Sequence, residues 1–204
     1  MKTTANVKLV TAFLILSIMV AASAWAIPKP DPGDTLPPVD ISKIIERVEV
    51  EWAEDGDWSS GWFYKGEDGG YMEMFFPKGQ SKDSWKEMIT IEMVAGGRRP
   101  NLPGAARMIF RGTEQSCPDA TWEILHKDKS DPVHQAILFE IRCPKFIADQ
   151  PPEVQIWKLI VGRTGMFIVQ YTYRGEEMPA ESQDAMKKFF DSTKIITENI
   201  KEEE

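Results

Sequence analysis

The alternation of apolar and polar residues predicts that most of this chain forms β-strands. In Ile44–Trp52 (IIERVEVEW), apolar and acidic residues alternate after Arg47, which is the two-residue period of a strand with one buried face. The same period, or a short apolar run bounded by turn residues, predicts further strands over Gly61–Lys65, Tyr71–Phe76, Met88–Val94, Ala120–Lys127, Val133–Arg142, Val154–Gly162 and Met166–Arg174.

Apolar residues at helical spacing predict two main helices. The first covers Gly104–Gln115, and the second covers Pro179–Lys194, where acidic residues stand near the N-terminal end. Between two of the strands, Pro77-Lys-Gly79 predicts a sharp turn, and Ser81 stands where a helix N-cap would precede a short turn of helix at Lys82–Glu87.

Short connections rich in Gly, Pro and Asp separate the predicted strands, and such connections are typical of β-hairpins. Because hairpins pair strands in opposite directions, the sheet is expected to be antiparallel. We therefore expect a single α+β domain over residues 44–204, in which one antiparallel sheet packs against the two main helices.

The N-terminal residues have the composition of an export signal. Met1–Ala26 combines Lys2 and Lys8 with an apolar run and an Ala-Trp-Ala end, which predicts a signal peptide cleaved before Ile27. The alternative, an uncleaved anchor, is disfavoured because the run is short for a bilayer span of about 20 residues. Residues 27–43 are rich in proline and are expected to form an extended leader. The mature protein is predicted to be periplasmic or secreted, with no membrane span.

Removal of the signal peptide makes the chain more acidic, because the segment contains two lysines and no acid. The formal net charge changes from −8 to −10. A protein of this charge is repelled by nucleic acids and by anionic lipids, so we expect neither as a partner. The acidic residues are spread along the sequence, which is typical of a solvated surface.

The two cysteines, Cys117 and Cys143, predict a disulfide, since an exported chain passes into an oxidising compartment. A hairpin that turns about Ser130 would place the two cysteines opposite each other. The same register would pair Trp122 with Leu138, Ile124 with Ala136, and His126 with His134.

The pairing of His126 with His134 suggests a metal site, because neutral imidazole binds zinc and copper. Zinc sites use three or four ligands, and local spacing fixes no third one, although Glu140 and Asp128 are available. The simpler interpretation is that both histidines are partly exposed hairpin residues.

Motifs for other chemistry are missing from the sequence. The chain has no Gly-x-Ser-x-Gly sequence and no phosphate-binding glycine motif, and both cysteines are used in the predicted disulfide. Enzymatic activity is therefore disfavoured, and no cofactor is predicted. Trp58 and Trp62 flank a predicted turn, where exposed aromatic rings would bind a partner protein. Alternatively, this loop folds back over the sheet.

Three segments together resemble the PsbP-like superfamily, named for an extrinsic subunit of photosystem II. They are the strand that ends in Phe76-Pro-Lys-Gly79, the hairpin Lys158–Tyr173 (KLIVGRTGMFIVQYTY), and a closing helix that ends in Phe189-Phe-Asp-Ser192. The segment after Phe76 is also similar to exported proteobacterial proteins of no known activity. The resemblance implies a non-catalytic binding or assembly role and identifies no functional residue.

Two hypotheses follow from these observations. In the first, the protein is an exported binding or assembly module that docks on an envelope or extracellular protein. In the second, it binds a metal, or acts as a metal-dependent hydrolase, through His126 and His134.

Overall fold

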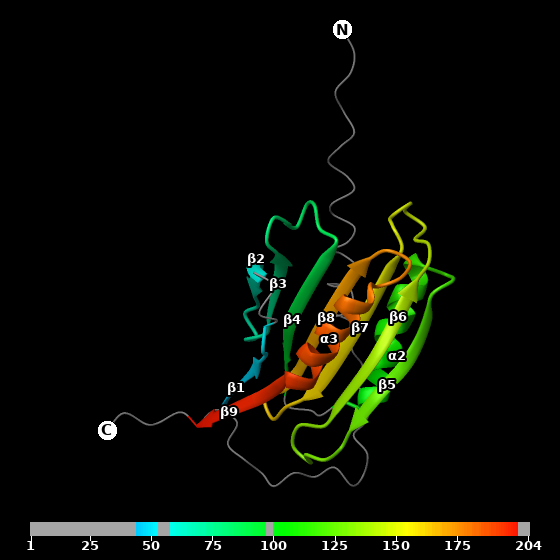
Figure 1. Cartoon of the computed structure of the whole chain (residues 1–204). Coiled ribbons are helices and arrows are strands. Elements are labelled where there is room, and N and C mark those ends of the chain that lie inside the picture. Colours follow the sequence, from blue (N-terminus) through cyan, green and yellow to red (C-terminus); the bar gives the residue numbers. More distant parts are fainter. Residues whose placement is uncertain (1–43, 53–57, 97–99, 200–204) are drawn as a thin grey trace.

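The computed structural model describes residues 44–52, 58–96 and 100–199, which fold into two antiparallel sheets and two helices (Figure 1). In chain order the elements are β1 (Ile44–Glu49), β2 (Trp58–Lys65), β3 (Tyr71–Pro77), β4 (Glu87–Ala95), α2 (Leu102–Ser116), β5 (Thr121–Asp128), β6 (Ala136–Cys143), β7 (Glu153–Val161), β8 (Gly165–Arg174), α3 (Ala180–Ser192) and β9 (Lys194–Asn199).

In the described part of the chain, the larger sheet contains seven strands in the order β2-β3-β4-β8-β7-β6-β5, so β2 and β5 are its edges. Every neighbouring pair is antiparallel. β8 lies at the centre and is buried along nearly its whole length. Its first half (GMFIV) is apolar because side chains on both of its faces are covered, and its second half includes the buried polar residues Gln170 and Thr172.

The two helices pack against opposite faces of this sheet (Figure 1). Ile137, Phe139 and Ile141 of β6 pack with the buried residues of α2. Val169 and Tyr171 of β8 pack with Met186, Phe189 and Phe190 of α3 on the other face. Alternate residues of one strand point to opposite faces, so the sheet separates two apolar cores.

The remaining two strands, β1 and β9, pair with each other and form a separate antiparallel ribbon. The expected architecture of a single sheet against two main helices is therefore wrong. The described residues form nine strands in two sheets, and strands predominate over helices. β9 was not predicted, and its partner lies near the other end of the chain. A local pattern in the sequence cannot indicate that β1 pairs with a strand so far away in the chain.

Both main helices and the predicted hairpin strands are confirmed, with changes at their ends. The turn after β3 is also confirmed, because Gly79 has a φ of 83° and Gln80 N donates to Pro77 O at 2.9 Å. The predicted turn of helix at Lys82–Glu87 is wrong. The side-chain oxygen of Gln80 accepts from the amides of Lys86 and Glu87 instead, which holds this segment in an irregular loop.

The predicted signal peptide and the Pro-rich leader lie outside the described residues, so both remain predictions. Within the described part of the chain, neither helix has the length and hydropathy needed to cross a membrane.

Candidate functional site

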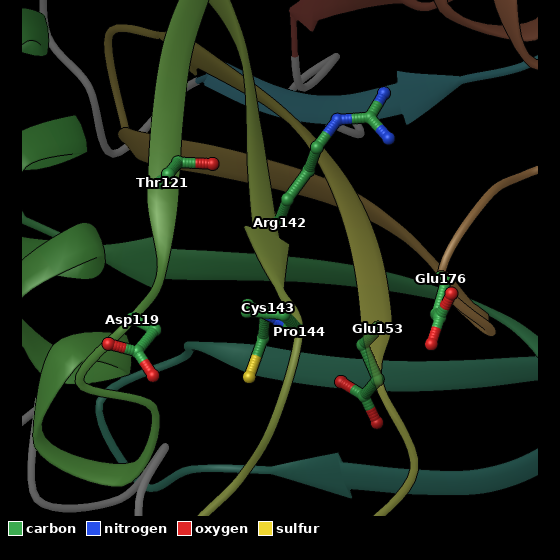
Figure 2. A pocket seen from close by; sticks show the side chains of 7 residues that line it. All are labelled: Asp119, Thr121, Arg142, Cys143, Pro144, Glu153 and Glu176. Atoms are coloured by element: carbon green, nitrogen blue, oxygen red, sulfur yellow. The ribbon is translucent and has the colours of Figure 1, made fainter.

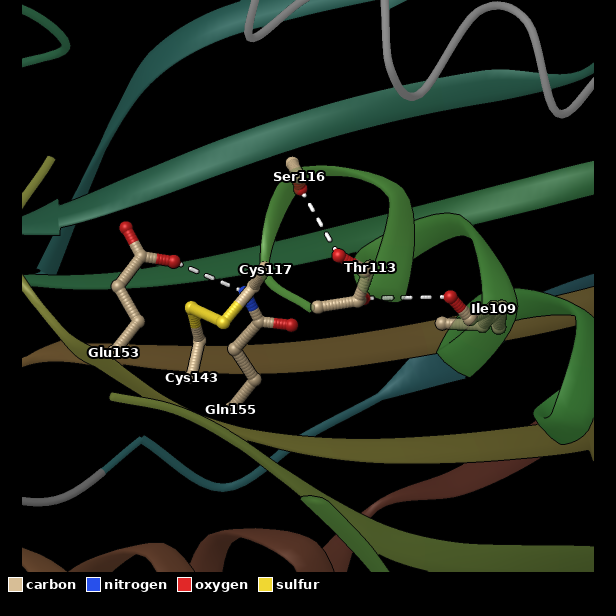
Figure 3. The surroundings of a disulfide bond; sticks show 7 residues. All are labelled: Ile109, Thr113, Ser116, Cys117, Cys143, Glu153 and Gln155. Carbon is tan, nitrogen blue, oxygen red and sulfur yellow. Dashed lines mark hydrogen bonds between the residues drawn. A yellow bond between two sulfur atoms is a disulfide. The ribbon is translucent and has the colours of Figure 1, made fainter. Parts of the chain in front are cut away.

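Cys117 and Cys143 form a disulfide, as predicted, and both are buried (Figure 3). Cys117 directly follows α2, and Cys143 is the last residue of β6. The bond therefore joins the C-terminal end of a helix to the sheet that the helix covers. The predicted hairpin register, which would have placed the two cysteines directly opposite each other, is wrong, because Trp122 pairs with Ile141 instead of Leu138.

The predicted pairing of the two histidines is also wrong. His126 lies opposite Leu138, because the hairpin turns about two residues later than predicted and Asp128 pairs with Ala136. His134 precedes β6, and its ring nitrogens lie 2.9 Å from Asp131 Oδ2 and 3.1 Å from Glu46 Oε1. Among the described residues, no group of three or more His, Cys, Asp or Glu side chains is arranged to hold a metal ion.

Trp58 and Trp62, the two predicted partner-binding residues, point to opposite faces of the sheet. Trp58 packs on the α3 face, where its ring centroid lies 6.2 Å from that of Trp52. Trp52 in turn contacts Phe75 and Phe189, with centroid distances of 4.8 and 5.8 Å. Trp58 therefore belongs to a packed aromatic cluster, and the two tryptophans do not form one surface.

Trp62 belongs to an exposed aromatic segment of β2, which we call the aromatic edge and define as Trp62, Phe63 and Tyr64. Phe63 is 56% exposed and Tyr64 is 49% exposed, on opposite faces of the strand. Trp62 stacks on Tyr64 at a centroid distance of 6.2 Å, and Phe63 stacks on Tyr71 at 6.5 Å. Large aromatic rings of β2 thus lie on both faces of this edge strand.

A bulge precedes the aromatic edge, since the β2–β3 register shifts between Ser60 and Trp62. The residue between them is Gly61. A side chain at Gly61 would have its Cβ 2.6 Å from the ring of Phe76, which is buried in the core. Because β2 passes so close to the ring of Phe76, only glycine fits at position 61. The bulge also determines on which face of the sheet the rings of Trp62, Phe63 and Tyr64 lie.

The two edges of the seven-stranded sheet differ in charge. β2 (WSSGWFYK) carries a single charged residue, Lys65, at its end. β5 (TWEILHKD) carries two acidic residues and a lysine, and its Leu125 is 47% exposed. Proteins commonly protect edge strands with charges and bulges, because an unpaired edge invites another strand to bind. The charged residues of β5 protect that edge in this way, whereas the aromatic edge on β2 is protected only by its bulge.

A pocket of about 300 Å³ lies at the end of β6, beside the disulfide (Figure 2). Asp119 and Glu153 lie on either side of Cys143, and the side chain of Arg142 extends away from them. Burial raises the pKa of Glu153, although hydrogen bonds from Gln155 and the nearby Arg174 oppose this effect. The buried carboxylate is already paired, so this pocket does not resemble a reactive site.

Of the three residues of the aromatic edge, Trp62 was selected from the sequence, and Phe63 and Tyr64 were not. The available signal was a strand with three consecutive aromatic residues and almost no charge, yet only the topology shows that this strand is an edge.

No protein-family model matches the chain, and no curated protein matches it either.

Proposed function

We propose that the protein is an exported, non-catalytic binding module that captures an extended segment of a partner protein along its aromatic edge. The observation that carries this proposal is the position of Phe63 and Tyr64. Each ring is about half exposed, and the two lie on opposite faces of an edge strand.

An added strand would gain two kinds of contact at β2. The outer backbone N–H and C=O groups of an edge strand have no neighbouring strand, so a partner segment can continue the hydrogen-bonded ladder. Alternate side chains of that segment would then pack on Phe63 on one face and on Tyr64 on the other. Aromatic rings are favourable contacts here, because they bury a large area and lose little conformational entropy.

Charge favours a basic partner. The mature chain is expected to carry a net charge of −10, and β2 itself adds only Lys65. A partner segment with apolar residues and flanking lysine or arginine would be steered toward the protein, and along the strand it would meet only one like charge, Lys65 at the end. Such a segment would belong to an envelope or extracellular protein, because the disulfide and the predicted signal peptide both favour an oxidising compartment.

The proposal is tested by capture with matched edge variants. Tagged mature protein would be incubated with envelope and culture-fluid extracts, and the retained proteins would be identified by mass spectrometry. A variant with Phe63→Lys and Tyr64→Lys places two charges on the aromatic edge. The control, Leu125→Lys, places one at a similarly exposed site on β5.

The expected result is a partner that the wild type and Leu125→Lys retain and that the double variant loses. Thermal unfolding of all three proteins would verify that the lysines leave the fold intact. If the double variant retains the same proteins as the wild type, the aromatic edge is not the docking surface. Equal loss with Leu125→Lys would assign the effect to general charge and would also contradict the proposal.

A further inference from the structure

Two polar side chains of β4, on the face of the sheet that carries α2, have no partner among the described residues. The hydroxyl of Thr90 is buried, with the residue only 3% exposed, and no described residue forms a hydrogen bond with it. Glu92 lies two residues further along the same strand, so it points to the same face. Burial raises the pKa of Glu92 to about 7, and no hydrogen bond or charge among the described residues opposes this effect.

These two side chains belong to two neighbouring rows that cross four strands. One row contains Tyr64, Met72, Glu92 and Ile168, and the other contains Trp62, Met74, Thr90 and Gln170. Side chains directly opposite each other in a sheet lie close together on one face. The carboxyl and hydroxyl groups therefore have two thioethers beside them on one side, followed by the stacked rings of the aromatic edge.

The rows lie beside α2. The helix packs mainly over β6 and β7, whereas the rows extend from β8 outward to β2. Exposure decreases along each row, in the first from Tyr64, which is 49% exposed, to the buried Ile168, and in the second from the partly buried Trp62 to the buried Thr90. The two rows thus extend from aromatic rings at the surface to a buried hydroxyl that has no hydrogen-bond partner among the described residues.

The chemistry of these groups selects a class of ligand. A partly buried carboxylate without a positive partner is stabilised by a cation. Thr90 offers an oxygen that accepts a hydrogen bond, so the cation should carry N–H donors. Hard metal ions such as Ca²⁺ take six to eight oxygen ligands, more than this face supplies. Methionine and aromatic side chains favour an attached alkyl chain and a nearby positive charge.

We propose that the two rows form a binding site for a small aliphatic amine. The ammonium group would pair with Glu92 and donate to Thr90, and the alkyl chain would lie along Met72 and Met74 toward the aromatic rings. Tyr64 belongs to both proposals, but amine binding does not require strand capture at β2, which depends also on the outer backbone of the edge and on Phe63 on the opposite face.

Calorimetric titration of oxidised mature protein with n-butylamine tests the proposal, and 1-butanol serves as the neutral match. Saturable binding of the amine and no binding of the alcohol are expected. Glu92→Gln should weaken amine binding by about tenfold or more, because it removes the ion pair. Glu73→Gln is the control, since Glu73 lies on β3 but points to the opposite face. It should leave the affinity unchanged.

Three results would overturn the amine site. They are no amine binding by the folded wild type, equal binding of amine and alcohol, and equal binding by wild type and Glu92→Gln. Silver(I) is a further probe, because thioethers prefer soft metals. Silver binding that requires Met72 and Met74 but not Glu92 would reassign the site to a soft metal ion. The Phe63→Lys variant should bind n-butylamine normally even if it fails to capture protein.

Discussion

Glu46 Oε2 accepts hydrogen bonds from both the amide and the hydroxyl of Thr164, each at 2.8 Å, although 118 residues separate the two in sequence. The other carboxylate oxygen lies 3.1 Å from His134 Nε2, and the side chain of Glu46 is fully buried. One carboxylate therefore connects β1 to the β7–β8 turn and to the β5–β6 loop. Burial alone would raise its pKa, but hydrogen bonds from Arg163, Thr164 and His134 outweigh that effect and lower it.

Replacing this carboxylate should destabilise the protein at neutral pH. A carboxyl group whose folded pKa is lowered stabilises the fold above its ordinary value of 4.5, and that contribution is lost as the pH falls through the folded value. Glu46→Gln should lower the free energy of unfolding by about 1–3 kcal/mol at pH 7. The difference from wild type should shrink below pH 4.5.

Urea unfolding at several pH values measures both effects. Glu49→Gln is the matched control, because Glu49 lies on the same strand but pairs with Lys194 at the surface. An exposed pair of this kind contributes at most about 1 kcal/mol. Equal destabilisation by the two variants would show that Glu46 does not anchor the ribbon.

Gly162 stands against the same carboxylate, and it should not tolerate a side chain. A Cβ at this position would lie 2.5 Å from Glu46 Oε2 and 2.8 Å from the ring of Phe167. Gly162→Ala should therefore reduce stability by about 1–3 kcal/mol in thermal or urea unfolding. Gly112→Ala is the control, because Gly112 lies in α2 with open space around its Cβ position.

The control substitution should stabilise the helix by about 0.5–1 kcal/mol, since alanine has the higher helix propensity. The two alanine variants are thus expected to change stability in opposite directions. If both raise stability, the close contact between Gly162 and Glu46 does not constrain the fold.

The contribution of Glu92 to the stability of the fold should depend on pH in the opposite direction to that of Glu46. The pKa of Glu92 is raised from 4.5 to about 7, so its contribution to stability is fully present below pH 4.5 and is lost as the pH rises through about 7. Glu92→Gln removes this dependence. Relative to wild type, the variant should gain about 2–3 kcal/mol between pH 5 and pH 8.

Unfolding free energies of both proteins at the two pH values provide the measurement. Glu73→Gln, on the opposite face of the sheet, should show no such gain. A constant difference between Glu92→Gln and wild type would mean that Glu92 is already paired in the folded protein.

The disulfide closes a loop between residues 26 apart, and its removal should cost stability. In the chain-entropy model a loop of this length contributes about 3.5 kcal/mol. Replacing Cys117 and Cys143 together with alanine should lower the unfolding free energy by roughly that amount. Reducing agent should destabilise the wild type similarly and leave the variant unchanged; a loss below about 1 kcal/mol would contradict this prediction.

Local patterns in the sequence predicted most elements of the fold but not their arrangement. The sequence predicted β1 from its alternation and β7 and β8 from their apolar runs, because the burial of side chains follows a regular pattern within each strand. The pairing of β1 with β9 was not, since each short strand shows only that it has a buried face. The hairpin register failed because the turn is centred near Pro132 and not at Ser130, so that Asp128 pairs with Ala136 and every predicted pair within the two strands is displaced by three or four residues.

The candidate site was predictable only in part. Trp62 was identified from its type and its place near a turn, and Trp58 was grouped with it by proximity in sequence. The bulge at Gly61 places the two rings on opposite faces, so that grouping was wrong. Glu92 looked like any other acid of an acidic chain. The role proposed for it depends on Thr90 and on the uncharged neighbours that other strands supply.

The most direct test of the proposed function is hydrogen exchange of β2 in the complex with the captured partner. We predict that the amides of residues 59–65 exchange more slowly when the partner is bound, while those of β5, the other edge, do not change. This result would show that the partner adds a strand to the aromatic edge. Unchanged exchange at β2 in a complex that is demonstrably formed, with protection elsewhere on the protein, would contradict the account.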